Sequence, residues 1–141
     1  MKFKKENKIV FYTLSLTWGL LWTLIGILVL AIIKIIYRKG VEITNCHGRI
    51  AIHFYEKNFG GVSLGLVIIT SGPQQTESLT RHELGHTIQA ALFGPLFIPC
   101  VAIPSGIRYQ YRMRTKRPLK TTYDSIWFER QATEFGDKYF R

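Results

Sequence analysis

His82-Glu83-Leu84-Gly85-His86 is the stretch of this 141-residue chain from which its fold can be worked out. Residues four apart in an α-helix lie on one face, so a helix here places the two imidazoles side by side. Two histidines in this arrangement bind one zinc ion, and the glutamate between them takes a proton from a water that the metal activates. The pattern therefore predicts a helical Zn²⁺ site with His82 and His86 as metal ligands and Glu83 as catalytic base.

The residues around the motif favour a helix over residues 76–93. Thr76 or Ser78 can cap its start, because a side-chain oxygen at that position accepts a hydrogen bond from a free backbone N–H. No proline interrupts it, and Gly94-Pro95 is a typical stop signal.

A catalytic zinc ion takes three protein ligands and keeps a fourth position open. A second expected helix, residues 123–139, offers the third ligand. Its apolar stripe comprises Phe128, Ala132, Phe135 and Tyr139. Glu129 lies at the edge of that stripe, whereas Glu134 lies toward the polar side, so Glu129 is the predicted ligand. Glu134, His47 and His53 remain the alternatives.

The local pattern Glu129-Arg130-Gln131-Ala132-Thr133 resembles the E-x-x-A-D signature of gluzincin-type membrane zinc metallopeptidases. In that family a second helix supplies a glutamate ligand, which agrees with the role predicted for Glu129. Thr133 stands where the family has an aspartate that orients a ligand histidine. The resemblance therefore implies that Thr133 orients a ligand histidine, through a hydroxyl that accepts a hydrogen bond without carrying charge.

The motif region also resembles a group of small bacterial membrane proteins that carry the same H-E-x-x-H motif. The likeness covers residues 84–89, 94–96 and 103–105. It favours a bacterial source and implies nothing about the substrate.

The N-terminal part of the chain is strongly apolar. No charged residue occurs between Lys8 and Lys34, and that run exceeds the roughly 20 apolar residues that a bilayer demands. It is too long for a signal-peptide core and no small-x-small cleavage site follows it. We expect residues 1–39 to form a single-pass anchor in the cell membrane, followed by a zincin-like metal-binding domain over residues 40–141.

Two β-rich stretches precede the motif, residues 49–55 and 62–70, with a turn signal at residues 58–61. They predict a β-hairpin. The strand just before a metal helix pairs with extended substrates in zinc peptidases, so we expect residues 62–70 to have that role.

Residues 88–107 carry no charge and contain three prolines, which argues against a straight transmembrane helix. Two interpretations stay open, a buried core loop and a re-entrant segment beside the site. The basic, aromatic residues 108–114 follow, in a chain of net charge +10. They fit lipid headgroups better than nucleic acid, and a plain solvated surface accounts for them too.

These patterns predict an α+β protein: a transmembrane helix, a β-hairpin, the motif helix, an apolar proline-rich loop and a helix that carries Glu129. Cys46 and Cys100 form no metal-binding pattern and are expected to be buried free thiols. Candidates for an oxyanion donor are Arg108, Tyr109, Tyr111, Arg112 and Tyr123, none of them favoured.

The expected function is hydrolysis of peptide bonds in protein or peptide substrates by a membrane-anchored zinc endopeptidase. The main alternative is a non-catalytic zinc-binding membrane scaffold or partner protein, which the threonine at position 133 and the small size favour. A membrane-tethered nucleic-acid binder is a third hypothesis.

Overall fold

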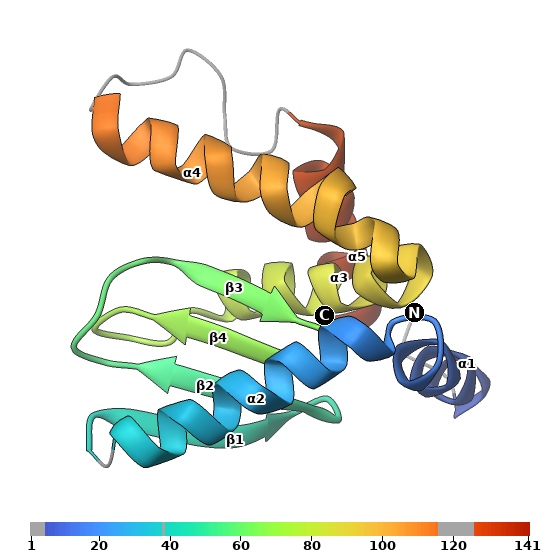
Figure 1. Ribbon diagram of the computed structural model, residues 1–141, viewed down its shortest axis with the longest axis horizontal. Coiled ribbons are helices and arrows are strands. Elements are labelled where there is room, and N and C mark those ends of the chain that lie inside the picture. The colour runs from blue at the N-terminus through green and yellow to red at the C-terminus, as the bar shows by residue number, and fades with distance from the viewer. Residues whose placement is uncertain (1–4, 38, 116–125) are drawn as a thin grey trace.

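The structure, a computed structural model, describes residues 5–37, 39–115 and 126–141. Within these ranges the chain is an α+β protein with a four-stranded sheet and five α-helices (Figure 1). The elements are, in order, α1 (Lys5–Leu16), α2 (Leu20–Ile36), β1 (Val41–Cys46), β2 (Arg49–Phe54), β3 (Gly61–Leu64), β4 (Val67–Ser71), α3 (Glu77–Phe93), a 3₁₀ turn (Gly94–Leu96), a π-helical turn (Ile98–Ala102), α4 (Ile103–Thr115) and α5 (Trp127–Phe140).

The sheet has the strand order β1-β2-β4-β3 and contains two hairpins joined in parallel. The predicted hairpin between residues 49–55 and 62–70 is therefore wrong: β2 and β4 run parallel, and residues 61–71 form a hairpin of their own. Two short connections explain the difference. His47 and Gly48 both have positive φ, as a two-residue hairpin turn requires, and Gly65 has a φ of 63° between β3 and β4.

Both faces of the sheet are covered, which explains why every residue of β4 is buried. On one face, Ala51 and Ile68 belong to a core with Leu84 and Ile88 of α3. On the other face, Ile52 and Val67 pack with α2, whose ribbon crosses in front of the sheet in Figure 1. The apolar N-terminal segment therefore supplies the second cover of the sheet.

The motif helix α3 begins and ends where the sequence predicts. Thr76 is its N-cap residue, although its side chain makes no capping hydrogen bond. Gly94 ends it with a φ of 55°, and a Cβ at Gly94 would lie 2.3 Å from the indole nitrogen of Trp18. Glycine is needed here for its backbone conformation and for the close approach of the N-terminal segment.

The predicted single-pass helix is not what the structure shows. Among the described residues no single helix is long and apolar enough to cross a membrane, and the apolar run is split into α1 and α2, which meet at 80°. Buried hydrogen bonding holds the bend: the Thr23 hydroxyl of α2 donates to the Ser15 carbonyl of α1 over 3.1 Å. The N–H of Gly19 donates to the Leu14 carbonyl over 2.7 Å.

The proline-rich segment is also helical rather than an irregular loop. Pro99 is the second residue of the π-helical turn and Pro104 lies in the first turn of α4, where a missing N–H costs little. This segment meets α3 at 118° as a second bent pair. Phe97 and Val101 are buried, but Cys100 is exposed, so its predicted burial is wrong. Cys46 is partly buried.

A Gly26→Ala substitution tests whether α2 is a packed layer. The new Cβ would lie 2.2 Å from the backbone oxygen of Leu64, so we expect a loss of about 1–3 kcal/mol of stability. Gly106→Ala in α4 is the matched control, since nothing lies within 4 Å of its added Cβ. Urea unfolding of both variants measures the difference, and equal stability of the two would contradict the packing described here.

Candidate metal centre

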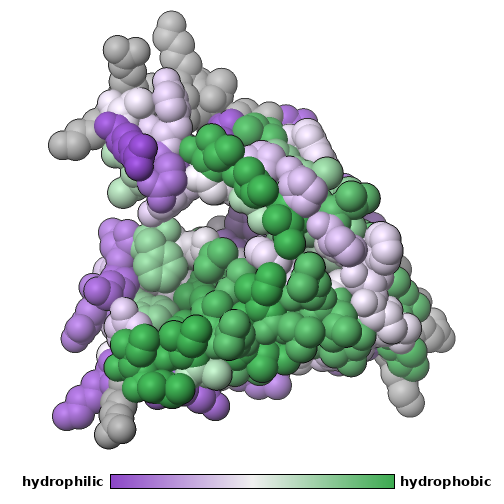
Figure 2. Space-filling model, viewed as in Figure 1, coloured by the Kyte–Doolittle hydropathy of each residue, from purple (hydrophilic) through white to green (hydrophobic). Residues whose placement is uncertain are grey.

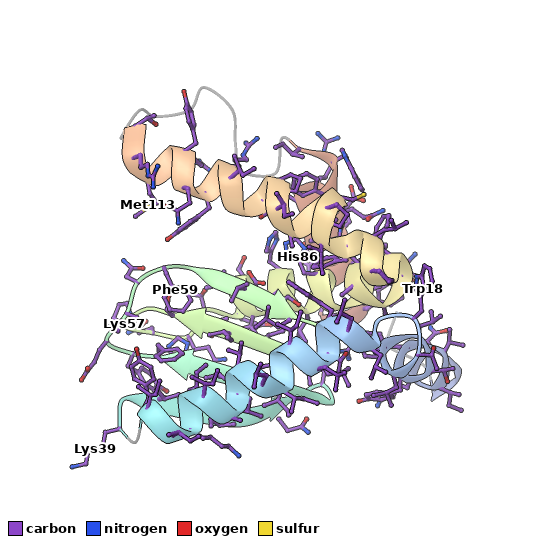
Figure 3. All side chains as sticks on the ribbon, in the orientation of Figure 1. Trp18, Lys39, Lys57, Phe59, His86 and Met113 are labelled. Carbon is purple, nitrogen blue, oxygen red and sulfur yellow. The ribbon has the colours of Figure 1, made fainter. Side chains whose placement is uncertain are left out.

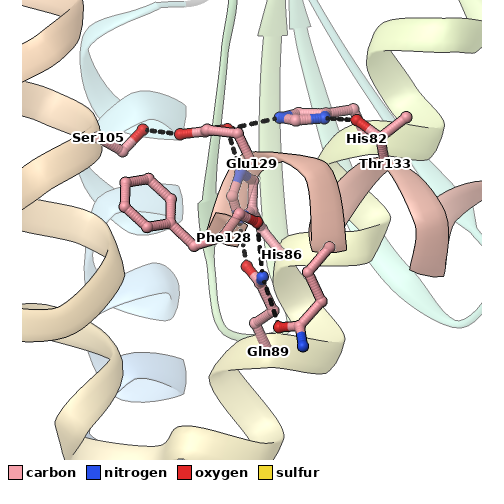
Figure 4. Close-up of polar contacts among 8 residues, drawn as sticks. His82, His86, Gln89, Ser105, Phe128, Glu129 and Thr133 are labelled. Carbon is pink, nitrogen blue, oxygen red and sulfur yellow. Dashed lines mark hydrogen bonds and ion pairs between the residues drawn. The ribbon is translucent and has the colours of Figure 1, made fainter. Parts of the chain in front are cut away.

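Two helices distant in sequence bring three predicted ligands together (Figure 4). His82 and His86 extend from α3, and Glu129 extends from the first turn of α5. The Nε2 atoms of His82 and His86 lie 3.1 and 3.2 Å from the same oxygen, Oε2 of Glu129. One ligand atom from each residue falls within 4.8 Å of the others, so the group could hold a metal ion. The predicted meeting of these three side chains is confirmed.

Small residues allow the two helices to approach closely enough for this contact. A Cβ at Gly85 would lie 1.8 Å from the carbonyl oxygen of Ala132, and one at Gly136 would lie 2.3 Å from that of Arg81. Ala132 itself is fully buried. The small pair Ala132 and Gly136, four residues apart on α5, was a sequence signal for this close packing that the motif analysis missed.

The outer nitrogens of both histidines have hydrogen-bond partners. Nδ1 of His82 lies 2.9 Å from the Thr133 hydroxyl, and Nδ1 of His86 lies 2.7 Å from the Gln89 side-chain oxygen. With a metal bound, Nδ1–H of each histidine would donate to these oxygens and Nε2 would offer its lone pair to the metal, whereas in the metal-free chain Nε2–H donates to Glu129. Thr133 thus has the contact that the family resemblance implies. Gln89 was missed as a partner, although its position one turn after His86 placed it on the same face.

The Gln89 amide is anchored to α5 as well. Its nitrogen donates to the Phe128 carbonyl over 2.7 Å and to the Gln131 side-chain oxygen over 3.0 Å. Gln89 is fully buried. The orientation of His86 is therefore coupled to the position of the helix that carries Glu129.

Glu129 is an ionised carboxylate in the interior, with no exposed surface. Burial by itself raises its pKa, but hydrogen bonds from His82, His86 and Ser105 outweigh burial and hold the pKa of this carboxyl far below its usual range. The Ser105 hydroxyl of α4 donates to Oε1 over 2.5 Å. Ser105 was not predicted as part of the site, and no spacing in the sequence indicated it.

Two of the three separations between donor atoms agree with a tetrahedral ion. Zinc bonds of about 2.0–2.1 Å at tetrahedral angles separate neighbouring ligand atoms by about 3.3 Å. The two nitrogen–oxygen separations in the site, 3.1 and 3.2 Å, are close to that value. Two imidazoles and one carboxylate are also a donor set found in zinc sites that keep a fourth position open.

The alternative third ligands lie elsewhere. Glu134 is exposed on α5. His53 is buried between the Thr70 hydroxyl and the Gly72 carbonyl, 2.8 and 3.1 Å from its two ring nitrogens. The His47 ring packs on Phe140 at a centroid distance of 5.3 Å.

Glu83 lies next to the cluster without belonging to it. Its side chain is buried beside Gly61 of β3, where an added Cβ would lie 2.4 Å from Oε1. Oε2 has no hydrogen-bond partner among the described residues. Burial raises the pKa of Glu83 above its usual range, although the neighbouring histidines lower it. A carboxyl with a raised pKa and a free oxygen suits proton transfer.

The cluster lies in a cleft between the sheet and α4, where Figure 3 shows His86. Two cavities of about 350 and 490 Å³ meet there and share Phe59, Gly61, Glu83 and Tyr109. Among the candidate oxyanion donors, Tyr109 lines both cavities, whereas Tyr111 is exposed and Tyr123 lies outside the described residues.

The strand that directly precedes the motif helix has no free edge to receive an extended substrate, contrary to the prediction. β4, which directly precedes α3, is an interior strand paired on both sides. The edge strand is β3, and its Gly61 and Ser63 line the cleft.

No protein-family model, curated protein or solved structure matches this chain. The gluzincin resemblance therefore stays a prediction based on the motif residues.

Metal content provides a direct test of the site. We expect one bound metal ion per chain in the parent protein and its loss in His82→Ala and in Glu129→Ala, because each removes one of three ligands. Glu134→Ala, an exposed position on the same helix, is the matched control and retains the ion. Elemental analysis of the purified proteins measures this, and metal retained in Glu129→Ala would contradict the assignment.

Thr133 offers a test of histidine orientation. Thr133→Val keeps the side-chain shape but removes the oxygen that accepts from His82, so metal affinity falls by about 10–100-fold. Thr133→Ser keeps the hydroxyl and stays near the parent value. Competition with a chromophoric chelator measures both, and equal affinity of the two variants would show that the contact has no influence.

Proposed function

We propose that this protein is a membrane-associated zinc endopeptidase that hydrolyses peptide bonds in protein or peptide substrates. The observation that carries the proposal is the combination of a three-ligand cluster with a buried glutamate, Glu83, whose free oxygen lies in the same cleft. A purely structural metal site has four protein ligands and no need of such a group.

Zinc is the metal that we propose, with His82, His86 and Glu129 as its ligands. The two imidazole nitrogens among the three donor atoms favour it over calcium or magnesium, which prefer oxygen-only sites. When bound, zinc lowers the pKa of a coordinated water and polarises a carbonyl group.

Glu83 is the proposed general base and acid. Its unpartnered Oε2 accepts a proton from the attacking water, and the raised pKa of Glu83 lets it return that proton to the leaving amine. Gly61 is needed beside it, because any side chain there would occupy the space of the carboxylate.

Extended substrates have a place to bind along β3. The Gly60 carbonyl accepts from the Ser71 N–H of β4. Because successive residues of an antiparallel strand point their N–H and C=O groups to opposite sides, those of Gly61 and Ser63 point toward the free edge of β3. The Ser63 carbonyl already accepts from the Trp22 indole over 3.1 Å. A peptide that adds to this edge would therefore pair mainly with Gly61, next to Glu83.

The alternative is a non-catalytic zinc-binding scaffold. Its support is the uncharged Thr133 hydroxyl beside His82, where a carboxylate would raise the basicity of the ligand. Activity measurements distinguish the two.

Glu83→Gln is the decisive variant. It keeps the shape of the side chain but removes the base, so cleavage of casein falls by at least about 100-fold while zinc content stays unchanged. Glu77→Gln, on the exposed side of the same helix, is the matched control and cleaves at the parent rate. Equal cleavage by Glu83→Gln and the parent would sink the catalytic proposal, and no zinc-dependent cleavage by the parent favours the scaffold.

A further inference from the structure

The outward side of α2 is a continuous apolar surface. Eight large apolar side chains on it are between 40% and 75% exposed: Leu20, Leu21, Leu24, Ile27, Leu28, Ile32, Ile35 and Ile36. The opposite side of the helix is already packed on the sheet, with Thr23, Gly26 and Ile33 buried. The exposed side therefore has no place in the core of this chain.

A second apolar stripe lies on α4. Ile103, Ile107 and Tyr111 follow one another at four-residue spacing and are more than half exposed, and Leu96 lies just before them. Figure 2 shows that the apolar surfaces of α2 and α4 face the same side of the molecule, and that a hollow opens between α4 and the sheet. Two separate elements thus present apolar side chains in one direction.

The cavity beside the metal cluster lies between these two surfaces. Trp22 of α2 lines one wall, and Ala102 and Gly106, next to the stripe, line the opposite one. His86 and Glu83 lie inside the same cavity. A substrate that reaches the cluster between α2 and α4 therefore passes the apolar surfaces.

Exposed lysines border the apolar face, with Glu56 beside Lys57. Lys34, Lys39 and Lys57 are exposed, and Figure 3 shows Lys39 and Lys57 at one end of the sheet and α2. The chain as a whole has a net charge of +10. Trp18 and Tyr37, at the two ends of α2, are 49% and 40% exposed, as aromatic rings at a membrane interface are. Apolar side chains with bordering lysines complement an anionic lipid surface.

We infer that α2 and α4 seat the protein on an anionic bilayer surface, with the cavity between them facing the lipid. The substrate class that follows is a peptide segment held at the membrane surface. The substrate part rests on the proposed endopeptidase function, whereas the lipid contact does not. The helix α2 lies along the surface rather than across it: its 17 residues span about 25 Å, short of a bilayer core of about 30 Å.

Lipid binding is tested by flotation of the full-length chain with vesicles of phosphatidylcholine and phosphatidylglycerol, using the Glu83→Gln protein so that activity plays no part. We expect binding that weakens at least about tenfold in Leu24→Glu/Leu28→Glu and in Ile103→Glu/Ile107→Glu, since each pair removes apolar contact. It should also weaken with salt and with pure phosphatidylcholine, because the lysines would lose their anionic partners.

Thr44→Glu is the matched control. Thr44 is exposed on β1 and pairs with Ala51, on the α3 face of the sheet, so this variant keeps the parent affinity. Far-UV circular dichroism confirms folding, and the second double variant keeps the test valid if the first one fails to fold.

Three results would overturn the lipid contact as described. The first is no vesicle binding, or binding that both double variants leave unchanged. The second is a dimer in solution that the variants dissociate, which would assign the face to a second copy of the chain. The third is resistance to alkaline carbonate extraction from the vesicles, which indicates a membrane-spanning helix.

The substrate class is tested separately. A quenched-fluorescent peptide containing the casein bond that the parent cleaves is made with and without a palmitoyl chain. On anionic vesicles we expect at least about tenfold faster cleavage of the palmitoylated form by the parent, and no such preference in Leu24→Glu/Leu28→Glu. Equal rates for the two peptides would overturn the membrane-surface substrate, whereas failure of the parent to cleave casein at all would contradict the endopeptidase function and leave the vesicle result standing.

Discussion

The close crossing of α3 and α5 is the constraint on which the site depends. Gly85 and Ala132 meet with no room for a Cβ on the glycine, and this contact sets the reach of Glu129 toward the two histidines. A side chain such as valine at position 85 would push the helices apart, so that Glu129 could no longer hydrogen-bond to the two histidines. Packing between two backbones therefore determines whether the ligands share one coordination sphere.

The buried charge of Glu129 makes the stability of this helix crossing depend on metal binding. Glu129 is a buried charge, and burial of a carboxylate is costly unless it is paired and hydrogen-bonded. His82, His86 and Ser105 supply the partners in the metal-free chain. A divalent cation held by the same oxygen would stabilise the folded state further, so metal binding and folding are coupled at this site.

The part of the molecule that the sequence predicted well is the part governed by local periodicity. The extent of α3, the pairing of His82 with His86, and the choice of Glu129 over Glu134 all follow from the angle of about 100° per residue in a helix. The parallel pairing of β2 with β4 did not follow, because strand pairing depends on turn conformations such as the positive φ of His47.

The apolar run at the N-terminus shows the limit of prediction from hydropathy. The sequence alone showed that residues 9–33 carry no charge and that the chain contains the H-E-x-x-H motif. Only the tertiary structure decided that one side of α2 covers the sheet, that Trp22 reaches the cleft, and that Ser105 and Gln89 support the ligands. The reason is physical: an apolar side chain gains free energy in lipid and in a protein core alike, so hydropathy cannot distinguish the two, whereas the available packing surface can.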